Sequence, residues 1–157
     1  MKWYTDKNLT IQFDEVPYLS VRVAVPSMTD IEKKSIKKYP FINKRDLKVR
    51  IIYHVKDDRI HEFTIPKNYC WNGSDIPRCF WRLVGAKSEP QYLVASCLHD
   101  YVLENKHLIL NDRRLSTEIF KGCLLEAGVG KIKAQIMAEC VDMFQRFCDW
   151  GLEFNNG

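Results

Sequence analysis

Apolar and polar residues alternate in several stretches of the first 66 residues. The alternation covers 9–13, a β-branched and aromatic stretch at 18–25, and two longer runs at 47–55 and 59–65. A period of two is typical of a strand with one buried face. We therefore predict four strands, and we expect the last two to form a hairpin through the polar turn at 56–59.

The hairpin predicts its own buried face. One face of the first strand carries Leu47, Val49, Ile51, Tyr53 and Val55. The same face of the returning strand carries His61, Phe63 and Ile65. We expect these side chains to point into the core.

Helical spacing dominates the second half of the chain. Capping signals predict helices over 88–104 and from Asn111 or Asp112 to about 127, with a shorter helix at 75–85. Gly128 fits the left-handed position after the second of these. Helical spacing of apolar residues predicts a last helix over about 131–149. The last helix carries a broad apolar face, which we expect to pack against the sheet as the core helix: Ile132, Ile136, Cys140, Val141, Phe144 and Phe147.

These elements predict one α+β domain over 1–157. Residues 1–66 are expected to be mainly β, with a short helix near 29–39, and 67–150 mainly helical. We predict a small antiparallel β-sheet from the N-terminal half, packed against three to four helices from the C-terminal half. The aromatic tail at 150–154 either packs back or docks on a neighbouring subunit.

Composition narrows the class of protein. The 157 residues carry a net charge of +4, which is milder than in a dedicated nucleic-acid binder. No apolar run reaches the roughly 20 residues of a membrane span, and we predict no membrane association.

The six cysteines form no Cys-x-x-Cys pair, and no apolar signal segment opens the chain. We interpret them as reduced thiols of a protein made in a host cytoplasm.

The richest candidate chemistry lies between residues 69 and 101. Asn72-Gly73 predicts a tight turn, and Ser74 or Asp75 can cap the helix that follows. Backbone amides here, with Arg78, offer an anion-binding site. The alternative is a capped turn that only starts a helix.

The next helix carries His99 and Asp100. His99 shares an apolar face with Tyr92, Ala95, Ser96 and Leu103, whereas Asp100 is rotated by about 100°. The imidazole is therefore either a hydrogen-bonded core group or part of a site. We predict that Asp75, Arg78, His99 and Asp100 form one polar cluster where sheet and helices meet.

Asn72-Gly-Ser-Asp-Ile-Pro-Arg78, Phe80-Trp81 and Leu98-His-Asp-Tyr101 resemble an uncharacterised phage and prophage family. Its pattern reads Asp-Gly-Ala-Ser-Ile-Pro-Arg, an aromatic pair, then His-Asp-Tyr. A third block, Arg…Ala-Asp…Phe, corresponds to 114–120, and the resemblance covers about 60–147. It implies a phage or prophage origin and a compact α+β domain. Asn72 and Thr117 stand where the pattern has acids, which weakens a metal site.

Three function classes follow. We prefer a bacteriophage structural or accessory protein, possibly part of the virion or tail, with other phage proteins as partners. In a metal-dependent hydrolase of peptidoglycan or a phosphoester, His99, Asp75 and Asp100 would bind a divalent metal and activate water, with Glu118 or Asp112 assisting. A binding module for an anion or host factor would use Asn72, Ser74, Arg78, Tyr101, Arg114 and Glu118.

The stretch from Lys33 to Arg50 is the most basic part of the chain. It predicts either an electrostatic contact with nucleic acid or an acidic partner, or a solvated helix and loop. Interspersed acids favour the solvated surface.

Overall fold

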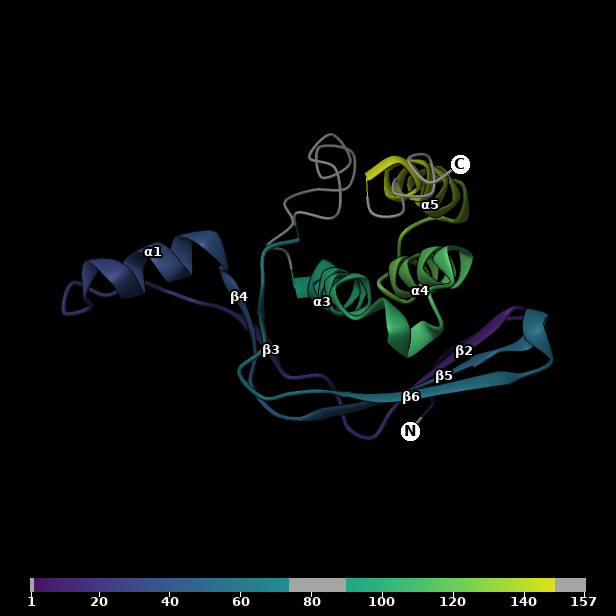
Figure 1. The fold of residues 1–157 in the computed structure, drawn as a ribbon, viewed down its shortest axis with the longest axis horizontal. Coiled ribbons are helices and arrows are strands. Elements are labelled where there is room, and N and C mark those ends of the chain that lie inside the picture. Colours follow the sequence, from purple (N-terminus) through teal and green to yellow (C-terminus); the bar gives the residue numbers. More distant parts are fainter. Residues whose placement is uncertain (1, 74–89, 149–157) are drawn as a thin grey trace.

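The structure is a computed structural model that describes residues 2–73 and 90–148 (Figure 1). Strands fill the N-terminal half and helices the C-terminal half, which confirms the α+β class. The described helices are α1 (Asp30–Lys38), α3 (Pro90–Glu104), α4 (Arg113–Glu126) and α5 (Lys131–Cys148). The predicted helix at 75–85 and the 150–154 tail lie outside the described residues.

The main sheet has four antiparallel strands in the order β1-β2-β5-β6. They are β1 (Lys2–Thr5), β2 (Leu9–Phe13), β5 (Leu47–Tyr53) and β6 (Arg59–Ile65). Ile51 lies opposite Ile11 on one side and His61 on the other, and all three are buried. The hairpin and its buried face are as predicted up to Tyr53.

The hairpin differs from the prediction at its tip. The strand ends at Tyr53, and a short 3-10 turn, η1 (His54–Lys56), leaves Val55 exposed. His54 donates or accepts a 2.8 Å hydrogen bond with Thr10 on β2, and the turn closes through left-handed residues at Asp57 and Asp58. The alternation of apolar and polar residues therefore extends to Val55, two residues beyond the end of β5.

A second sheet of three short strands was not predicted. Its order is β3-β4-β7, with β3 (Leu19–Val21), β4 (Phe41–Asn43) and β7 (Cys70–Trp71). The predicted strand at 18–25 is wrong beyond Val21, because β4 pairs only as far as Phe41. Val23 and Val25 are exposed. Phe41 and Trp71 form a tilted ring pair in the core.

The helices stack above the main sheet in layers (Figure 1). Helix α4 packs on β1 and β2, and at Gly122 the absence of a side chain admits the ring of Tyr4. Helix α5 packs on α4 as the outer layer, so it is not the predicted core helix against the sheet. Ile132, Ile136 and Phe147 are exposed, which corrects the predicted apolar core face.

Helix α1 confirms the short helix predicted near 29–39. Thr29 and Glu32 form a reciprocal capping box, with hydrogen bonds of 3.2 and 2.7 Å. Ile36 is the buried residue of the helix, which projects from the body on the segments that leave β3 and enter β4 (Figure 1). We call residues 22–40 the arm.

Candidate functional site

The turn after β7 is fastened to α3. Trp71 is fully buried, and its indole nitrogen donates a 2.9 Å hydrogen bond to Oγ of Ser96. Two residues later Gly73 has φ 70°, a left-handed conformation that suits glycine and confirms the predicted bend. Its backbone amide donates a 2.8 Å hydrogen bond to Oδ2 of Asp100. Asp100 is 1% exposed, so this carboxylate lies inside the protein.

The neighbouring imidazole is directed to other elements. His99 is also 1% exposed; its Nε2 is hydrogen bonded to the side-chain amide of Gln145 on α5, and its ring lies 5.1 Å from that of Phe120 on α4. Burial lowers the pKa of His99 to about 3, so the ring is neutral at physiological pH. His99 therefore belongs to the packing between three helices.

Gln145 extends the contact into a buried chain of polar groups. Oγ of Ser116 donates a 2.9 Å hydrogen bond to Oε1 of Gln145 and lies 2.7 Å from the carbonyl oxygen of Arg113. If the Gln145 amide donates to Nε2 of His99, the ring proton lies on Nδ1. Within the described residues Nδ1 has no hydrogen-bond partner. These hydrogen bonds connect α3, α4 and α5 through their side chains.

The predicted cluster of Asp75, Arg78, His99 and Asp100 is described only in its second half. Ser74, Asp75 and Arg78 lie outside the described residues. His99 is bonded toward α5, whereas Asp100 is bonded toward the turn after β7. Among the described partners, the two side chains do not converge on a common point.

The remaining predicted binding residues belong to three elements: the turn after β7, α3 and α4. Asn72 is half-buried beside the Gly73 turn. Tyr101 donates a 3.0 Å hydrogen bond from its hydroxyl to the carbonyl oxygen of Thr64 on β6. Arg114 and Glu118 form the i, i+4 pair expected from their spacing, with 3.8 Å between nitrogen and oxygen. That these residues share one binding site stays a prediction.

Arg114 belongs to an ionic cluster between α4 and α5 that centres on Asp142. Arg113 and Arg114 contact the Asp142 carboxylate at 3.1 and 3.2 Å, and Thr117 donates a 2.7 Å hydrogen bond to it. Burial alone raises the pKa of Asp142, but the hydroxyl and the two guanidinium groups outweigh it and the net shift is downward. Thr117 thus stabilises a carboxylate from another helix.

A second cluster joins the hairpin to α4. Arg59 donates from Nε to Nε2 of His61 at 2.9 Å and pairs with Asp112 at 2.8 Å. Asp112 also caps α4 by accepting from Leu115, as its place before the helix predicted. Burial and the nearby Arg59 lower the pKa of His61. The sequence missed this contact because 53 residues separate its ion pair.

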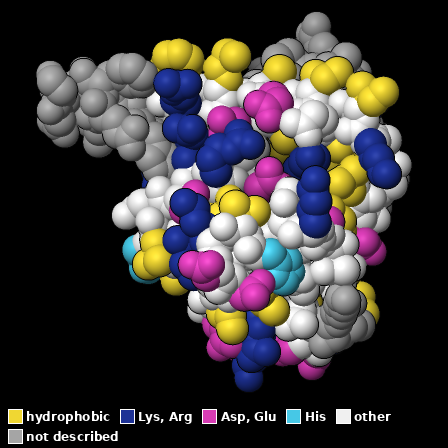
Figure 2. Space-filling model, turned by 90° about the vertical axis from the view of Figure 1, so that its right-hand side faces the viewer, with side chains coloured by type: hydrophobic (Ala, Val, Ile, Leu, Met, Phe, Trp, Pro, Cys, Tyr) yellow, Lys and Arg dark blue, Asp and Glu magenta, His cyan; other side chains and the backbone are white. Residues whose placement is uncertain are grey.

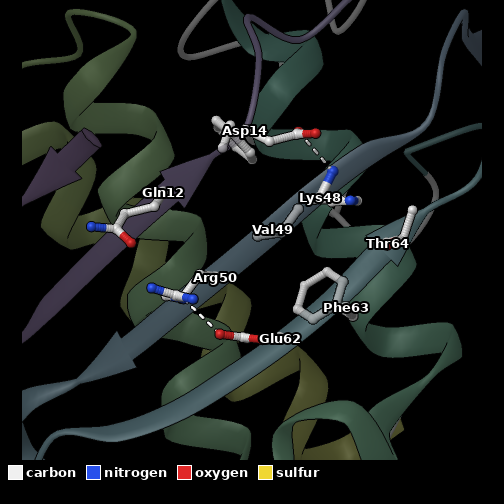
Figure 3. A pocket seen from close by; sticks show the side chains of 9 residues that line it. Gln12, Asp14, Lys48, Val49, Arg50, Glu62, Phe63 and Thr64 are labelled. Atoms are coloured by element: carbon white, nitrogen blue, oxygen red, sulfur yellow. Dashed lines mark hydrogen bonds and ion pairs between the residues drawn. The ribbon is translucent and has the colours of Figure 1, made fainter. Parts of the chain in front are cut away.

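Two hollows on the surface lie away from His99 and Asp100. A cavity of about 440 Å³ spans β2, β5 and β6; Figure 3 shows Arg50 and Glu62 paired across it, with 2.7 Å between Nε and Oε1. Another, of about 380 Å³, lies at the start of α4 and is lined by Lys56, Arg59 and Arg114. Basic and acidic side chains are interspersed over the face in Figure 2. Neither hollow gathers an apolar pocket with convergent catalytic groups.

Side chains of the types that can bind a metal ion do not form a cluster in the described part of the chain. Within residues 2–73 and 90–148, no group of three or more His, Cys, Asp or Glu side chains is placed to hold a metal ion. The predicted set of His99, Asp75 and Asp100 includes one residue outside those ranges. Nε2 of His99 is also hydrogen bonded to Gln145.

The fold and the buried His-Asp helix define a small α+β domain. The chain belongs to the family of proteins of unknown function DUF1353, whose model matches residues 46–141. That match runs from the residue before β5 into α5 and includes the Gly73 turn and His99. It ends at residue 141, one residue before Asp142.

One relative matches 59% of the chain. The chain is 32% identical over 92 residues to the uncharacterized protein y4jT of Sinorhizobium fredii, which covers 59% of this chain. The chain spans about a quarter of that relative's length, 26%. No solved structure matches the chain.

Two further findings concern the wider predictions. The four described cysteines Cys70, Cys97, Cys123 and Cys140 are free, in keeping with reduced thiols. No described helix is long and apolar enough to cross a membrane.

Proposed function

We propose that this chain is a non-catalytic structural or accessory protein of bacteriophage or prophage origin. In this account it works by binding another phage protein, either in the virion or during its assembly. The motifs at 72–78 and 98–101 support the origin through their resemblance to phage and prophage sequences. His99 and Asp100 then serve as the internal fastening of the domain.

One observation carries the proposal: the groups most suited to chemistry are used inside the fold. His99 is 1% exposed and bonded to Gln145, and Asp100 accepts from the backbone of Gly73. A general base must reach the proton that it removes, and its pKa must lie near the working pH. A buried imidazole with a pKa of about 3 meets neither condition.

The arm supports the choice of a binding role. It projects from the body and exposes Val23, Val25 and Ile31 together with four lysines of α1. Between residues 22 and 45 the chain has seven Lys and Arg against two acids, whereas the whole chain has 24 against 20. Apolar side chains beside an excess of cations suit a protein partner with an acidic rim.

The metal-dependent hydrolase remains the alternative proposal. It would need Asp75 to reach the buried pair, together with a path for substrate to His99. An anion or host-factor site at Ser74 and Arg78 is a further alternative, and it depends on the same undescribed turn.

The experiment measures whether the protein is present in phage particles and whether it hydrolyses peptidoglycan. Phage particles from a strain carrying the gene are purified and their protein content is measured, using wild type, His99→Gln and an arm variant with Lys33, Lys34, Lys37 and Lys38 changed to Glu. We expect wild type and folded His99→Gln in the particles or their assembly intermediates, and the arm variant to be lost. Absence of all three, with peptidoglycan hydrolysis that His99→Gln abolishes, would favour the hydrolase.

A further inference from the structure

Strand β3 is an outer strand of the second sheet. It pairs with β4 on one side, and within residues 2–73 and 90–148 no strand pairs with its other side. The amide of Lys44 donates to the carbonyl oxygen of Tyr18 at 2.8 Å, and the amide of Arg22 donates at 2.6 Å to the residue before β4. Because the residues bonded to one neighbour alternate along an antiparallel strand, the backbone groups of Leu19 and Val21 point away from β4.

The side chains along this edge are apolar on one face. Leu19, Val21 and Val23 alternate in sequence and therefore share a face. Leu19 packs against the core, whereas Val21 is 44% and Val23 71% exposed. Edge strands are usually protected from further pairing by charged residues or proline, and β3 itself contains neither. The edge is therefore suited to pairing with another strand.

The opposite face of the same stretch carries cations. The guanidinium group of Arg45 lies 5.7 Å from the ring centroid of Tyr18 and pairs with Glu15 at 3.1 Å. Arg22 follows β3, and the chain then enters the arm with its four lysines. Residues 15–45 contain seven Lys and Arg against three acids, a net charge of +4. That equals the net charge of the whole chain, so the other residues are neutral in sum.

We propose that an extended segment of the partner protein adds to the open edge of β3 as a further strand. Its backbone would bond to Leu19 and Val21, and its side chains would alternate between apolar residues on the face of Val23 and acidic residues on the face of Arg22. Charge complementarity supports an acidic partner segment. A second copy of this chain would instead bring the cations of two arms together.

This inference rests on the proposed function, because it names the chemistry of the partner contact beside the arm. The second sheet lies where the arm joins the body, so one partner can contact both (Figure 1). The backbone bonds would supply part of the affinity, and the alternating side chains would supply the specificity.

Amide hydrogen exchange in the full chain tests whether the edge is open. The amides of Leu19 and Val21 should exchange at least about tenfold faster than those of Arg22 and Lys44, which are bonded within the sheet. Equal protection of Val21 and Arg22 would overturn the proposal, because other residues of this chain would then cover the edge.

The probe for the partner segment is a blocked seven-residue peptide that alternates Val and Glu. At low salt it should slow exchange of the Val21 amide at least about tenfold, and about 0.5 M NaCl should weaken the effect. The matched control peptide alternates Val and Lys and should have no effect. A Val/Glu peptide without effect at millimolar concentration, or equal effects of the two peptides, would contradict an acidic strand.

Val21→Pro tests the outward N–H group directly. Proline lacks the amide hydrogen, and at this edge position it leaves the bonds between β3 and β4 in place. Val21→Thr is the matched control, since it keeps the amide and a β-branched side chain. Folded Val21→Pro, checked by circular dichroism, should not bind the Val/Glu peptide, whereas Val21→Thr should. Equal binding by the two variants would refute strand addition, and the wild-type titration decides the matter even if Val21→Pro does not fold.

The same variants in purified phage particles separate this inference from the proposed function. The amount of Val21→Pro per particle should fall at least about tenfold, and Val21→Thr should remain. Particles that keep folded Val21→Pro but lose the arm variant would refute strand addition and leave the proposed function standing. Absence of wild type from particles, with the peptide response intact, would refute the proposed function and support the β3 edge as a binding site.

Discussion

The backbone amide of Gly73 and the carboxylate of Asp100 are joined by a 2.8 Å hydrogen bond inside the protein. This bond connects the bend after β7 to the middle of α3. It gives the acid of the His-Asp pair a structural use, because a buried carboxylate needs donors to offset its lost hydration. The pair is therefore an anchor for the turn on one side and for the helices on the other.

Removal of the Asp100 carboxylate should destabilise the domain. Asp100→Ala leaves the Gly73 amide without this acceptor, and we expect a loss of about 2–3 kcal/mol in the free energy of unfolding. Asp100→Asn is the matched variant, since its side-chain oxygen can still accept; it should lose less than half as much. Urea denaturation measures both. Equal losses would contradict the role given to the Gly73 bond.

The Gln145 amide should matter through its two buried partners. Gln145→Leu leaves Nε2 of His99 and Oγ of Ser116 with one fewer partner each, so we expect a cost of about 1–3 kcal/mol. Gln135→Leu, at an exposed position of the same helix, should stay within about 0.5 kcal/mol of wild type. Thermal or urea unfolding compares the two variants. If the costs are alike, the buried chain of polar groups does not stabilise α5.

Stability should fall in mild acid because His99 is buried in its neutral form. Its pKa in the folded protein, about 3, lies below the ordinary 6.5. Between these values the unfolded chain binds a proton that the folded protein does not, so stability decreases as pH falls from 6.5 towards 3. The slope from this residue approaches about 1.4 kcal/mol per pH unit.

Urea titrations between pH 4 and 7 test this dependence. His99→Gln should flatten the slope by up to one proton, although the variant is less stable at neutral pH. His107→Gln removes an exposed imidazole and serves as the control. An unchanged slope in His99→Gln would show that the imidazole binds its proton over the same pH range in the folded and the unfolded protein, which would contradict the lowered pKa.

Asp142 should stabilise the α4–α5 contact throughout the neutral range. Its pKa is lowered in the folded protein, so its contribution is present above the ordinary value of 3.8 and is lost as acid protonates the carboxylate below it. Asp142→Asn is expected to cost about 1–3 kcal/mol at pH 7. Glu139→Gln, an exposed acid near Arg114, should cost far less. Chemical denaturation at pH 7 and at pH 3 measures the free energy of unfolding of both variants and of wild type.

Thiol reactivity should report the packing of α3 and α4. Burial raises the pKa of the Cys97 and Cys123 thiols, so both should resist Ellman's reagent in the folded protein. Cys140 is half-buried and should react faster. Cys140→Ser should therefore remove a fast phase and leave the slow thiols unchanged. In urea all six cysteines should react. Rapid labelling of Cys97 before unfolding would contradict the packing around His99.

The fold was predicted best where the signal is local. The short helix near 29–39, the Asp112 cap and the left-handed Gly128 depend on neighbouring residues and are all present. Strands β4 and β7 were missed because each is two or three residues long and is defined by pairing with distant segments. Periodicity also cannot name the partner of an apolar face, and so α5 was placed on the sheet.

The candidate site shows the same division. Spacing placed His99 on a buried face, but it could not identify Gln145, 46 residues away, as its partner. Helical spacing showed that Asp100 points about 100° away from His99, but we still predicted that both belong to one polar cluster. Asp100 is buried because α3 is covered on nearly all sides, including by the turn at Gly73. The Asp75 and Arg78 half of the prediction stays untested.

The most direct test of the account is the protonation state of His99, measured by nitrogen-15 NMR of the imidazole in the full chain. We expect a neutral ring in one tautomer from pH 5 to 8, unchanged by added Zn²⁺ or Mn²⁺. A ring that titrates within that range, or whose signals shift on metal binding, would contradict a structural His99.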